Sequence, residues 1–318
     1  MSTYIAELVK ARTTLPIRTN IATFAAACLT SCALLFGCGS TSGGNSTDVP
    51  DETTSQPYVV DETYNTIQST LSKPNLLDNR EIVCWGDSMT YGFGADKAII
   101  RTADGTYDAS NKSYPQILGH LTGMKTYNFG FPGTTSDEIA MLQGGLDGSY
   151  NEWVQQLRGD KTVKRAAHHT GDIIIIEIGS NGGWDNDYAT LISQYWAMID
   201  YAGCEDYLIL GDTDDPGTSE GDLWQLPFDE LDEDVVETDW EIALQEEFGD
   251  RFINVRTYLI DKGLSVCGLN ATRQDLEDAE LGCISQQLRS DWTHLNSYGY
   301  YAKAVAIYER GIELGFWR

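Results

Sequence analysis

Short apolar runs alternate with longer mixed segments over residues 80–318. The clearest run is Asp172–Ile178, whose consecutive isoleucines are typical of a parallel strand buried on both faces. We expect four further strands, at Ile82–Trp85, Thr126–Phe129, Tyr207–Leu210 and Phe252–Val255. Apolar residues at helical spacing predict helices over Tyr114–Leu121, Ser136–Gln143, Tyr188–Tyr201 and Ser297–Leu314.

Strands that alternate with helices predict an α/β fold, in which a parallel sheet is covered by helices on both faces. The connections between successive strands should be right-handed crossovers. In sheets of this kind, ligands bind beyond the carboxyl ends of the strands. We therefore expect the functional residues to follow Trp85, Phe129, Ile178 and Leu210.

Two segments interrupt this pattern inside what we take to be one domain, residues 57–318. Ile99–Lys112 is polar and is predicted to be a loop. The segment 212–239 is rich in Asp and Glu and is predicted to be a surface insertion near the site.

The first residues have a different character. Basic residues dominate the charges of Met1–Asn20, and the uncharged apolar run Ile21–Phe36 follows, which is the layout of an export signal. This run is shorter than the ~20 residues that a spanning helix needs. It ends at Gly37-Cys38, which resembles the lipobox of bacterial lipoproteins and implies that signal peptide 1–37 is removed and Cys38 is lipidated. An uncleaved anchor and an ordinary signal with a chance cysteine are the alternatives.

Residues 38–56 are rich in Gly, Ser and Thr and predict a flexible linker between a lipid anchor and the domain. Together these features predict a bacterial protein that is anchored to the membrane outside the cytoplasm. The formal net charge of −27 argues against nucleic-acid binding, because an acidic chain repels phosphates.

The cysteine pattern leaves a disulfide open and argues against a metal site. Cys267 and Cys283 lie in one loop-rich stretch and are the best candidate pair in an oxidising compartment. Cys84 lies in an apolar strand and is predicted to be a buried free thiol. Spacings typical of metal ligands, such as CxxC or HExxH, do not occur in residues 38–318, so we expect no metal.

The predicted strand ends carry the residue types that acyl transfer needs. Ser88 follows the first strand, and Asp291 and His294 lie three residues apart near the end of the chain, a spacing that places both on one face of a helical turn. A serine hydroxyl needs a base such as histidine, and a carboxylate fixes the tautomer of that histidine. Gly133 and Asn181 follow the second and third strands, where a backbone N–H and a side-chain amide would stabilise an oxyanion.

These blocks together resemble the SGNH or GDSL hydrolase family. Gly86-Asp87-Ser88 matches the first block, Gly133 the second, Asn181 the third, and Asp291-Trp292-Thr293-His294 the last. The resemblance implies a three-layer α/β/α sandwich with a flavodoxin-like, five-stranded parallel sheet. It implies Ser88 as nucleophile, His294 as base and Asp291 as its partner. It also implies an oxyanion hole made by the Ser88 N–H, the Gly133 N–H and the Asn181 side chain, with no cofactor.

One position departs from the family pattern. The third block of the family reads Gly-x-Asn-Asp, whereas Gly182 follows Asn181 in this chain. The missing carboxylate puts the direction of the Asn181 amide in doubt, and Asp185 or Asp187 is a hypothetical replacement.

The sequence therefore predicts a serine esterase that forms an acyl-enzyme on Ser88. Removal of O-acetyl groups from a carbohydrate, or hydrolysis of another short acyl ester, is the favoured reaction. The alternatives are a lipase or phospholipase, a protease or acyltransferase that uses the same triad, and a catalytically weak glycan-binding lipoprotein on the same scaffold. Three aromatic residues near the motifs are candidates to line the substrate pocket, with ordinary packing as their other interpretation: Tyr91, Trp184 and Trp292.

Overall fold

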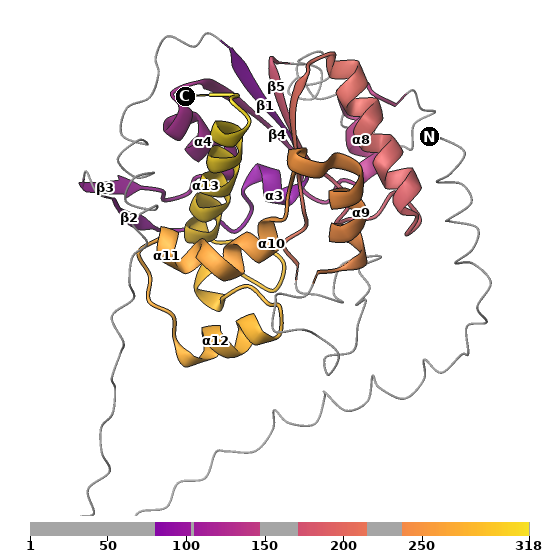
Figure 1. Ribbon diagram of the computed structural model, residues 1–318. Helices are drawn as coiled ribbons and strands as arrows, with labels where there is room; N and C mark the ends of the chain where they lie inside the picture. The colour runs from indigo at the N-terminus through magenta and orange to yellow at the C-terminus, as the bar shows by residue number, and fades with distance from the viewer. Residues whose placement is uncertain (1–79, 103–104, 147–170, 215–236, 318) are drawn as a thin grey trace, which may run out of the picture. The chain divides into compact units, whose positions relative to one another are not determined.

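The structure is a computed structural model that describes residues 80–102, 105–146, 171–214 and 237–317 (Figure 1). The chain divides into two units, Met1–Ser55 and Gln56–Arg318, and every described residue belongs to the second. The predicted signal peptide, Cys38 and the linker 38–56 lie outside the described residues, as does most of the acidic segment 212–239. Within the described ranges, none of the helices has the length and hydropathy needed to cross a membrane.

Five parallel strands form one sheet in the order β4-β1-β5-β6-β7. The predicted five-stranded parallel sheet is thereby confirmed, although the last strand is shorter than predicted. The strands are β1 (Glu81–Gly86), β4 (Lys125–Gly130), β5 (Ile173–Glu177), β6 (Asp206–Leu210) and β7 (Phe252–Ile253).

The first strand among the described residues, β1, lies between β4 and β5. Gly86 at its carboxyl end pairs in register with Gly130 of β4 and with Glu177 of β5. Three strands therefore end together, and the residues that follow them meet at one edge of the sheet.

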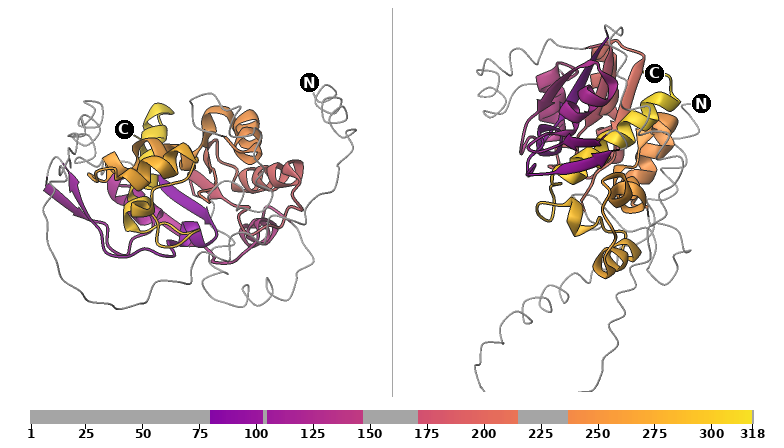
Figure 2. Two further views of the ribbon diagram at one scale, coloured as in Figure 1. Left: turned by 90° about the horizontal axis from the view of Figure 1, so that it is seen from below. Right: turned by 90° about the vertical axis from the view of Figure 1, so that its left-hand side faces the viewer.

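Alternate residues of each strand enter different cores, because successive side chains of a strand point to opposite faces. In β1, Ile82 and Cys84 belong to one core, and Val83 and Trp85 belong to the other. Helices α4 (Tyr114–Thr122) and α13 (Ser297–Glu313) cover the first core, whereas α5 (Ser136–Gln143), α8 (Tyr188–Ala202) and α9 (Asp239–Phe248) cover the second (Figures 1 and 2). This is the predicted three-layer α/β/α sandwich.

The four predicted helices are all present, with ends that differ by at most one residue, and local capping explains where they begin. Ser113 and Gln116 form a capping box at the start of α4, and Thr135 and Glu138 form another at the start of α5. Shorter elements complete the described fold: α3 (Ser88–Tyr91), α10 (Val255–Tyr258), η3 (Leu259–Gly263), α11 (Leu264–Val266), α12 (Arg273–Glu280), and the 3-10 helices η2 (Gly249–Arg251) and η4 (Gln286–Leu288).

The segment Ile99–Lys112 is not simply a loop, as its polarity had suggested. It contains an antiparallel hairpin of β2 (Ile99–Thr102) and β3 (Gly105–Asp108), which lies at the margin of the fold in Figures 1 and 2. Most side chains of β3 are exposed, so this strand carries little of the apolar signal by which a strand is recognised.

The candidate disulfide is wrong in this structure, since neither Cys267 nor Cys283 is in a disulfide bond. Cys267 is buried, and its Sγ lies 3.1 Å from the carbonyl oxygen of Tyr298 on α13. The Sγ of Cys283 instead lies 3.6 Å from the carbonyl oxygen of Leu281. The two thiols therefore have different partners, although the same stretch of sequence carries both. Cys84 is a buried free thiol, as predicted.

Candidate active site

Ser88 lies in the sharp turn between β1 and α3. Asp87 caps the helix by accepting a 2.9 Å hydrogen bond from the Met89 N–H, and Ser88 is its first residue. Gly86 makes this turn possible, because a Cβ there would lie only 2.2 Å from Thr90 Oγ1 and 2.5 Å from the Glu177 carbonyl oxygen. Ser88 is thereby held at the carboxyl edge of the sheet with its side chain partly exposed.

The structure brings Ser88, His294 and Asp291 into a continuous hydrogen-bonded chain. Ser88 Oγ lies 3.1 Å from His294 Nε2, and His294 Nδ1 lies 2.9 Å from Asp291 Oδ2. When Nδ1–H donates to the carboxylate, Nε2 carries the lone pair that accepts the serine proton. The three residues are therefore arranged for nucleophilic catalysis by serine.

Asp291 and His294 do not lie in a helical turn, contrary to the expectation from their spacing. They lie in a loop that Asp291 closes itself, because its Oδ1 accepts hydrogen bonds from the backbone N–H groups of Thr293 (2.9 Å) and His294 (2.7 Å). Slight burial raises the pKa of Asp291, but these hydrogen bonds and the one from the His294 ring outweigh it, so the net pKa is lowered. Asp291 is therefore held as a carboxylate.

The Arg289 side chain stabilises this loop by hydrogen bonds, a role that the sequence did not suggest. Its guanidinium is buried and donates to the carbonyl oxygens of Trp292 (3.0 Å) and Thr213 (2.9 Å). The second contact ties the loop of His294 to the segment that follows β6. The separation of these residues along the chain explains why sequence motifs did not reveal the contact.

Three groups at the edge of the sheet correspond to the predicted oxyanion hole. The backbone N–H groups of Ser88 and Gly133 donate to no other described residue. Gly133 has a φ of 74°, and a Cβ there would meet nothing within 4 Å, so the space next to its Cα is open. The Asn181 amide nitrogen completes the set, but it donates to Asp87 Oδ2 (3.1 Å) and to the Thr134 carbonyl oxygen (3.3 Å).

Gly182, which replaces the family aspartate, fixes the Asn181 turn through its backbone. Its carbonyl oxygen accepts hydrogen bonds from both the backbone N–H and the hydroxyl of Ser136, each 3.0 Å long. Asp187 does not replace the missing carboxylate, since it caps α8 by accepting from the Ala189 N–H. Asp185 is exposed with a φ of 53°, and no contact places it at the Asn181 turn.

Near Ser88 lies a buried group of ionisable residues that sequence analysis missed. Glu177 at the end of β5 pairs with Lys303 of α13, and its second carboxylate oxygen accepts from the Thr90 hydroxyl at 3.4 Å. Burial, reinforced by the negative charge of Glu177, raises the pKa of Asp87 to about 7. We call Asp87, Glu177 and Lys303 the buried charge cluster.

Of the three aromatic residues predicted to line a substrate pocket, two lie at the surface and one lies in the core. Tyr91 and Trp292 are 56% and 69% exposed, so their side chains are available to a substrate. Trp184 is buried, stacks against Tyr188 and donates its indole N–H to the Gly179 carbonyl oxygen, so the prediction that it lines the pocket is wrong. Phe93, which sequence analysis missed, is half-exposed and lies against the His294 ring with centroids 4.5 Å apart.

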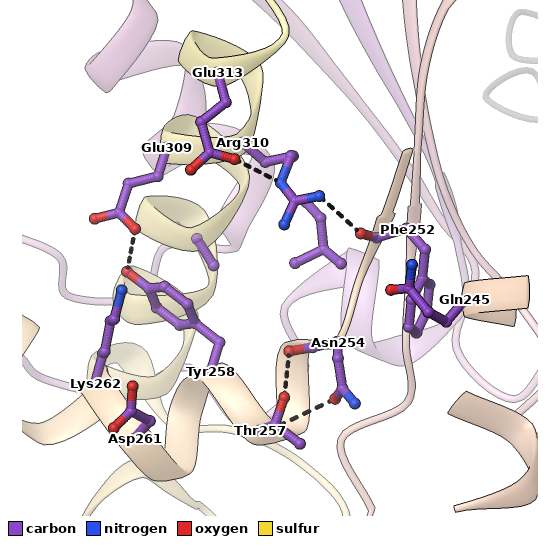
Figure 3. Close-up of a pocket in the computed structure, with 12 residues that line it drawn as sticks. Gln245, Phe252, Asn254, Thr257, Tyr258, Asp261, Lys262, Glu309, Arg310 and Glu313 are labelled. Carbon is purple, nitrogen blue, oxygen red and sulfur yellow. Dashed lines mark hydrogen bonds and ion pairs between the residues drawn. The ribbon is translucent and has the colours of Figure 1, made fainter. Parts of the chain in front are cut away.

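A cavity lies away from these residues, at the β7 edge of the sheet between α10 and α13 (Figure 3). Its wall includes charged side chains of Asp261, Lys262, Glu309 and Arg310, and it contains none of the predicted site residues. Across the described ranges, His, Cys, Asp and Glu nowhere gather in a group of three or more that would suit a metal ion.

Comparison with known proteins bears on the reaction class. None of the curated proteins matches the chain. A solved G-D-S-L family protein from Desulfitobacterium hafniense DCB-2 is 14% identical, with a TM-score of 0.40, over 73% of this chain and 99% of that one. An active-site mutant of a family two carbohydrate esterase from Clostridium thermocellum is 12% identical, with a TM-score of 0.39, over 77% and 66%.

At TM-scores below 0.5 these likenesses add nothing to the fold described above. The match to a sequence family is decisive instead, because it covers residues 84–302 and so includes Ser88, Gly133, Asn181, Asp291 and His294. The chain belongs to the GDSL-like lipase/acylhydrolase family.

Proposed function

We propose that this protein is a serine esterase that removes short acyl groups from a carbohydrate, with Ser88 as nucleophile, His294 as base and Asp291 as its partner. The observation that carries the proposal is the 3.1 Å contact between Ser88 Oγ and His294 Nε2, continued by the 2.9 Å contact between His294 Nδ1 and Asp291. Serine becomes a useful nucleophile only beside such a base.

The proposed reaction proceeds in two halves. Ser88 Oγ attacks the ester carbonyl carbon as its proton moves to His294 Nε2, and the collapse of the tetrahedral intermediate expels the alcohol, which takes that proton. Water then attacks the acyl-enzyme with His294 again as base, and the carboxylic acid leaves. If the acceptor were a sugar hydroxyl instead of water, the same acyl-enzyme would support acyl transfer.

The oxyanion would be stabilised by the Ser88 N–H, the Gly133 N–H and the Asn181 amide. Because both Asn181 amide hydrogens already have acceptors, the oxyanion must replace one of them. The Thr134 carbonyl is the group to be replaced, since its 3.3 Å contact is the longer and Asp87 holds the other hydrogen at 3.1 Å. Asp87 would then direct Asn181 during the reaction.

Exposure of the site favours a carbohydrate over a lipid. Phe93 is half-exposed against the His294 ring, Trp292 in the same loop is 69% exposed, and the Asp291 side chain is 41% exposed. An open site with exposed aromatic rings suits a polymer that lies along the surface, because rings pack against the C–H faces of sugars. A lipid anchor at Cys38 in the extracytoplasmic space would place this site near the polymers of the cell envelope.

The test is hydrolysis of p-nitrophenyl acetate by the wild-type protein and by Ser88→Ala, a change that removes only the hydroxyl. The proposal expects the variant to lose at least about a thousandfold in kcat/KM. Equal rates would exclude Ser88 as the nucleophile. A wild-type protein that binds glycans without hydrolysing any ester would support the glycan-binding alternative.

A further inference from the structure

A cavity of about 440 Å³ opens on the β4 side of Ser88. It lies between the end of α3, the start of α4 and the end of β4, and its volume is in the range of small-molecule sites. Its lining includes two aromatic residues, Tyr91 and Phe131, and two residues with side-chain amides, Asn111 and Gln116.

Two residues that line the cavity are linked to the candidate active site through the backbone, although none of the proposed catalytic residues lines the cavity itself. Tyr91 follows Ser88 by three residues in α3, so both side chains lie on one face of that turn. Phe131 is tied to the nucleophile turn by a 2.9 Å hydrogen bond from its N–H to the Gly86 carbonyl oxygen, and it leads into the Gly133 turn. We therefore expect the part of a substrate next to an ester at Ser88 to reach toward this cavity.

The lining of the cavity is uncharged, which is unusual in this chain. None of the ten residues around it is Asp, Glu, Lys or Arg, although these four types make up 22% of the sequence. The cavity at the β7 edge, by contrast, is lined by both acids and bases. Without a countercharge, the cavity beside Ser88 is suited to a neutral ligand, because a buried ion needs a partner.

The amides at the wall favour a ligand with hydroxyl groups over an alkyl chain. Gln116 Oε1 accepts from the Ser113 N–H at 3.0 Å, which directs the NH₂ of the same amide away from the helix end. The Asn111 side chain is exposed and bonds to none of the other described residues. An alkyl chain would remove these amides from water without forming hydrogen bonds to them, which costs free energy. Sugar hydroxyls would form those hydrogen bonds.

We propose that this cavity is a subsite for an uncharged sugar residue of the substrate, which packs against the aromatic residues Tyr91 and Phe131 and is hydrogen-bonded by the amides of Asn111 and Gln116. The inference rests on the proposed esterase function for its role in catalysis. Binding of a sugar there can be measured independently of any hydrolysis.

The most discriminating variant is Gln116→Glu. Glutamate keeps the oxygen that caps α4, since Ser-x-x-Glu is itself a capping box, but it removes the NH₂ donors and introduces a charge. Tyr91→Ala removes the exposed ring, and Tyr201→Ala is the matched control, because Tyr201 is a comparably exposed tyrosine at the end of α8. Asn111→Gly removes the second amide and tolerates the φ of 55°.

Two measurements together test the subsite. The first is the ratio of kcat/KM on acetylated xylo-oligosaccharides to kcat/KM on p-nitrophenyl acetate, which does not reach the cavity. Gln116→Glu and Tyr91→Ala should each lower this ratio about tenfold, the effect of one hydrogen bond or stacking contact, and Tyr201→Ala should leave it unchanged. The second is calorimetric binding of xylohexaose, cellohexaose and N-acetylchitohexaose to Ser88→Ala.

The possible results distinguish failure of the proposed subsite from failure of the proposed esterase function. Ser88-dependent hydrolysis of p-nitrophenyl acetate with an unchanged ratio in both cavity variants would overturn the subsite and leave the esterase intact. A protein that hydrolyses nothing but binds a neutral hexasaccharide, and loses that binding in Gln116→Glu, would support the subsite and overturn the esterase. Preference for p-nitrophenyl octanoate, or binding of hexagalacturonate alone, would contradict the proposal that the cavity binds a neutral sugar.

Discussion

Two groups of ionisable side chains flank Ser88, and they differ in their exposure to solvent. The side chains of Asp291 and His294 are 41% and 19% exposed, whereas those of Glu177 and Lys303 are 3% and 0% exposed. Charges in water are free to meet a substrate and contribute little to stability, but buried charges must be paired. We infer that the exposed pair serves the chemistry and that the buried charge cluster maintains the geometry of the nucleophile turn.

A change in the exposed pair should affect activity and not folding. Asp291→Asn keeps the oxygen that closes the loop but places an amide against His294 Nδ1, which favours the wrong tautomer. We expect kcat/KM on p-nitrophenyl acetate to fall roughly 10²–10⁴-fold. Urea denaturation should show nearly unchanged stability.

A matched control for this variant is Asp187→Asn, because Asp187 caps α8 and contacts none of the proposed catalytic residues. Its activity should match that of the wild type. An Asp291→Asn protein that unfolds more easily and keeps full activity would reverse the roles that we assign to the two groups.

The buried cluster should show the opposite behaviour. Lys303→Met removes the partner of Glu177 and leaves a buried carboxylate near Asp87, which should lower the free energy of unfolding by about 3–5 kcal/mol. The double variant Glu177→Gln/Lys303→Met removes both charges and should recover most of that loss. Urea denaturation measures both, and a single variant as stable as the wild type would show that the pair has no structural role.

The smallest expected effect concerns the pH dependence of stability. Because burial raises the pKa of Asp87 to about 7, the folded protein keeps a proton there that the unfolded chain releases at the ordinary carboxyl pKa of about 3.9. The folded state therefore binds more protons between these two values, and Asp87 makes stability fall as pH rises through that window.

Asp87→Asn should remove this contribution. Urea denaturation near pH 5 and pH 7 should show a larger loss of stability on raising the pH in the wild type than in the variant. Parallel losses in the two proteins would mean that Asp87 is not protonated in the folded state at the lower pH.

The same contrast explains what the sequence was able to predict. The sheet was predictable because parallel strands buried on both faces appear as continuous apolar runs, as at Ile173–Ile176. The five residues of the proposed site were predictable because each follows a strand or lies in a short motif. Asp291 and His294 lie three residues apart, so one motif contains both.

The buried charge cluster was not predictable, since Glu177 and Lys303 are separated by 126 residues and are joined only by the packing of α13 on the sheet. Burial of Trp184 and the separate surroundings of Cys267 and Cys283 depend on packing in the same way. The hairpin β2–β3 was not predicted for a different reason, because the polar side chains of an exposed strand resemble those of a loop.

The central claim is that Ser88 is activated by His294 to attack an electrophilic centre. Its most direct test is covalent labelling with diethyl p-nitrophenyl phosphate, followed by peptide mapping with mass spectrometry. The account predicts one diethylphosphoryl group on Ser88 in the wild type, slow labelling of His294→Ala, and none in Ser88→Ala. Labelling of another residue, or equally fast labelling of His294→Ala, would contradict it.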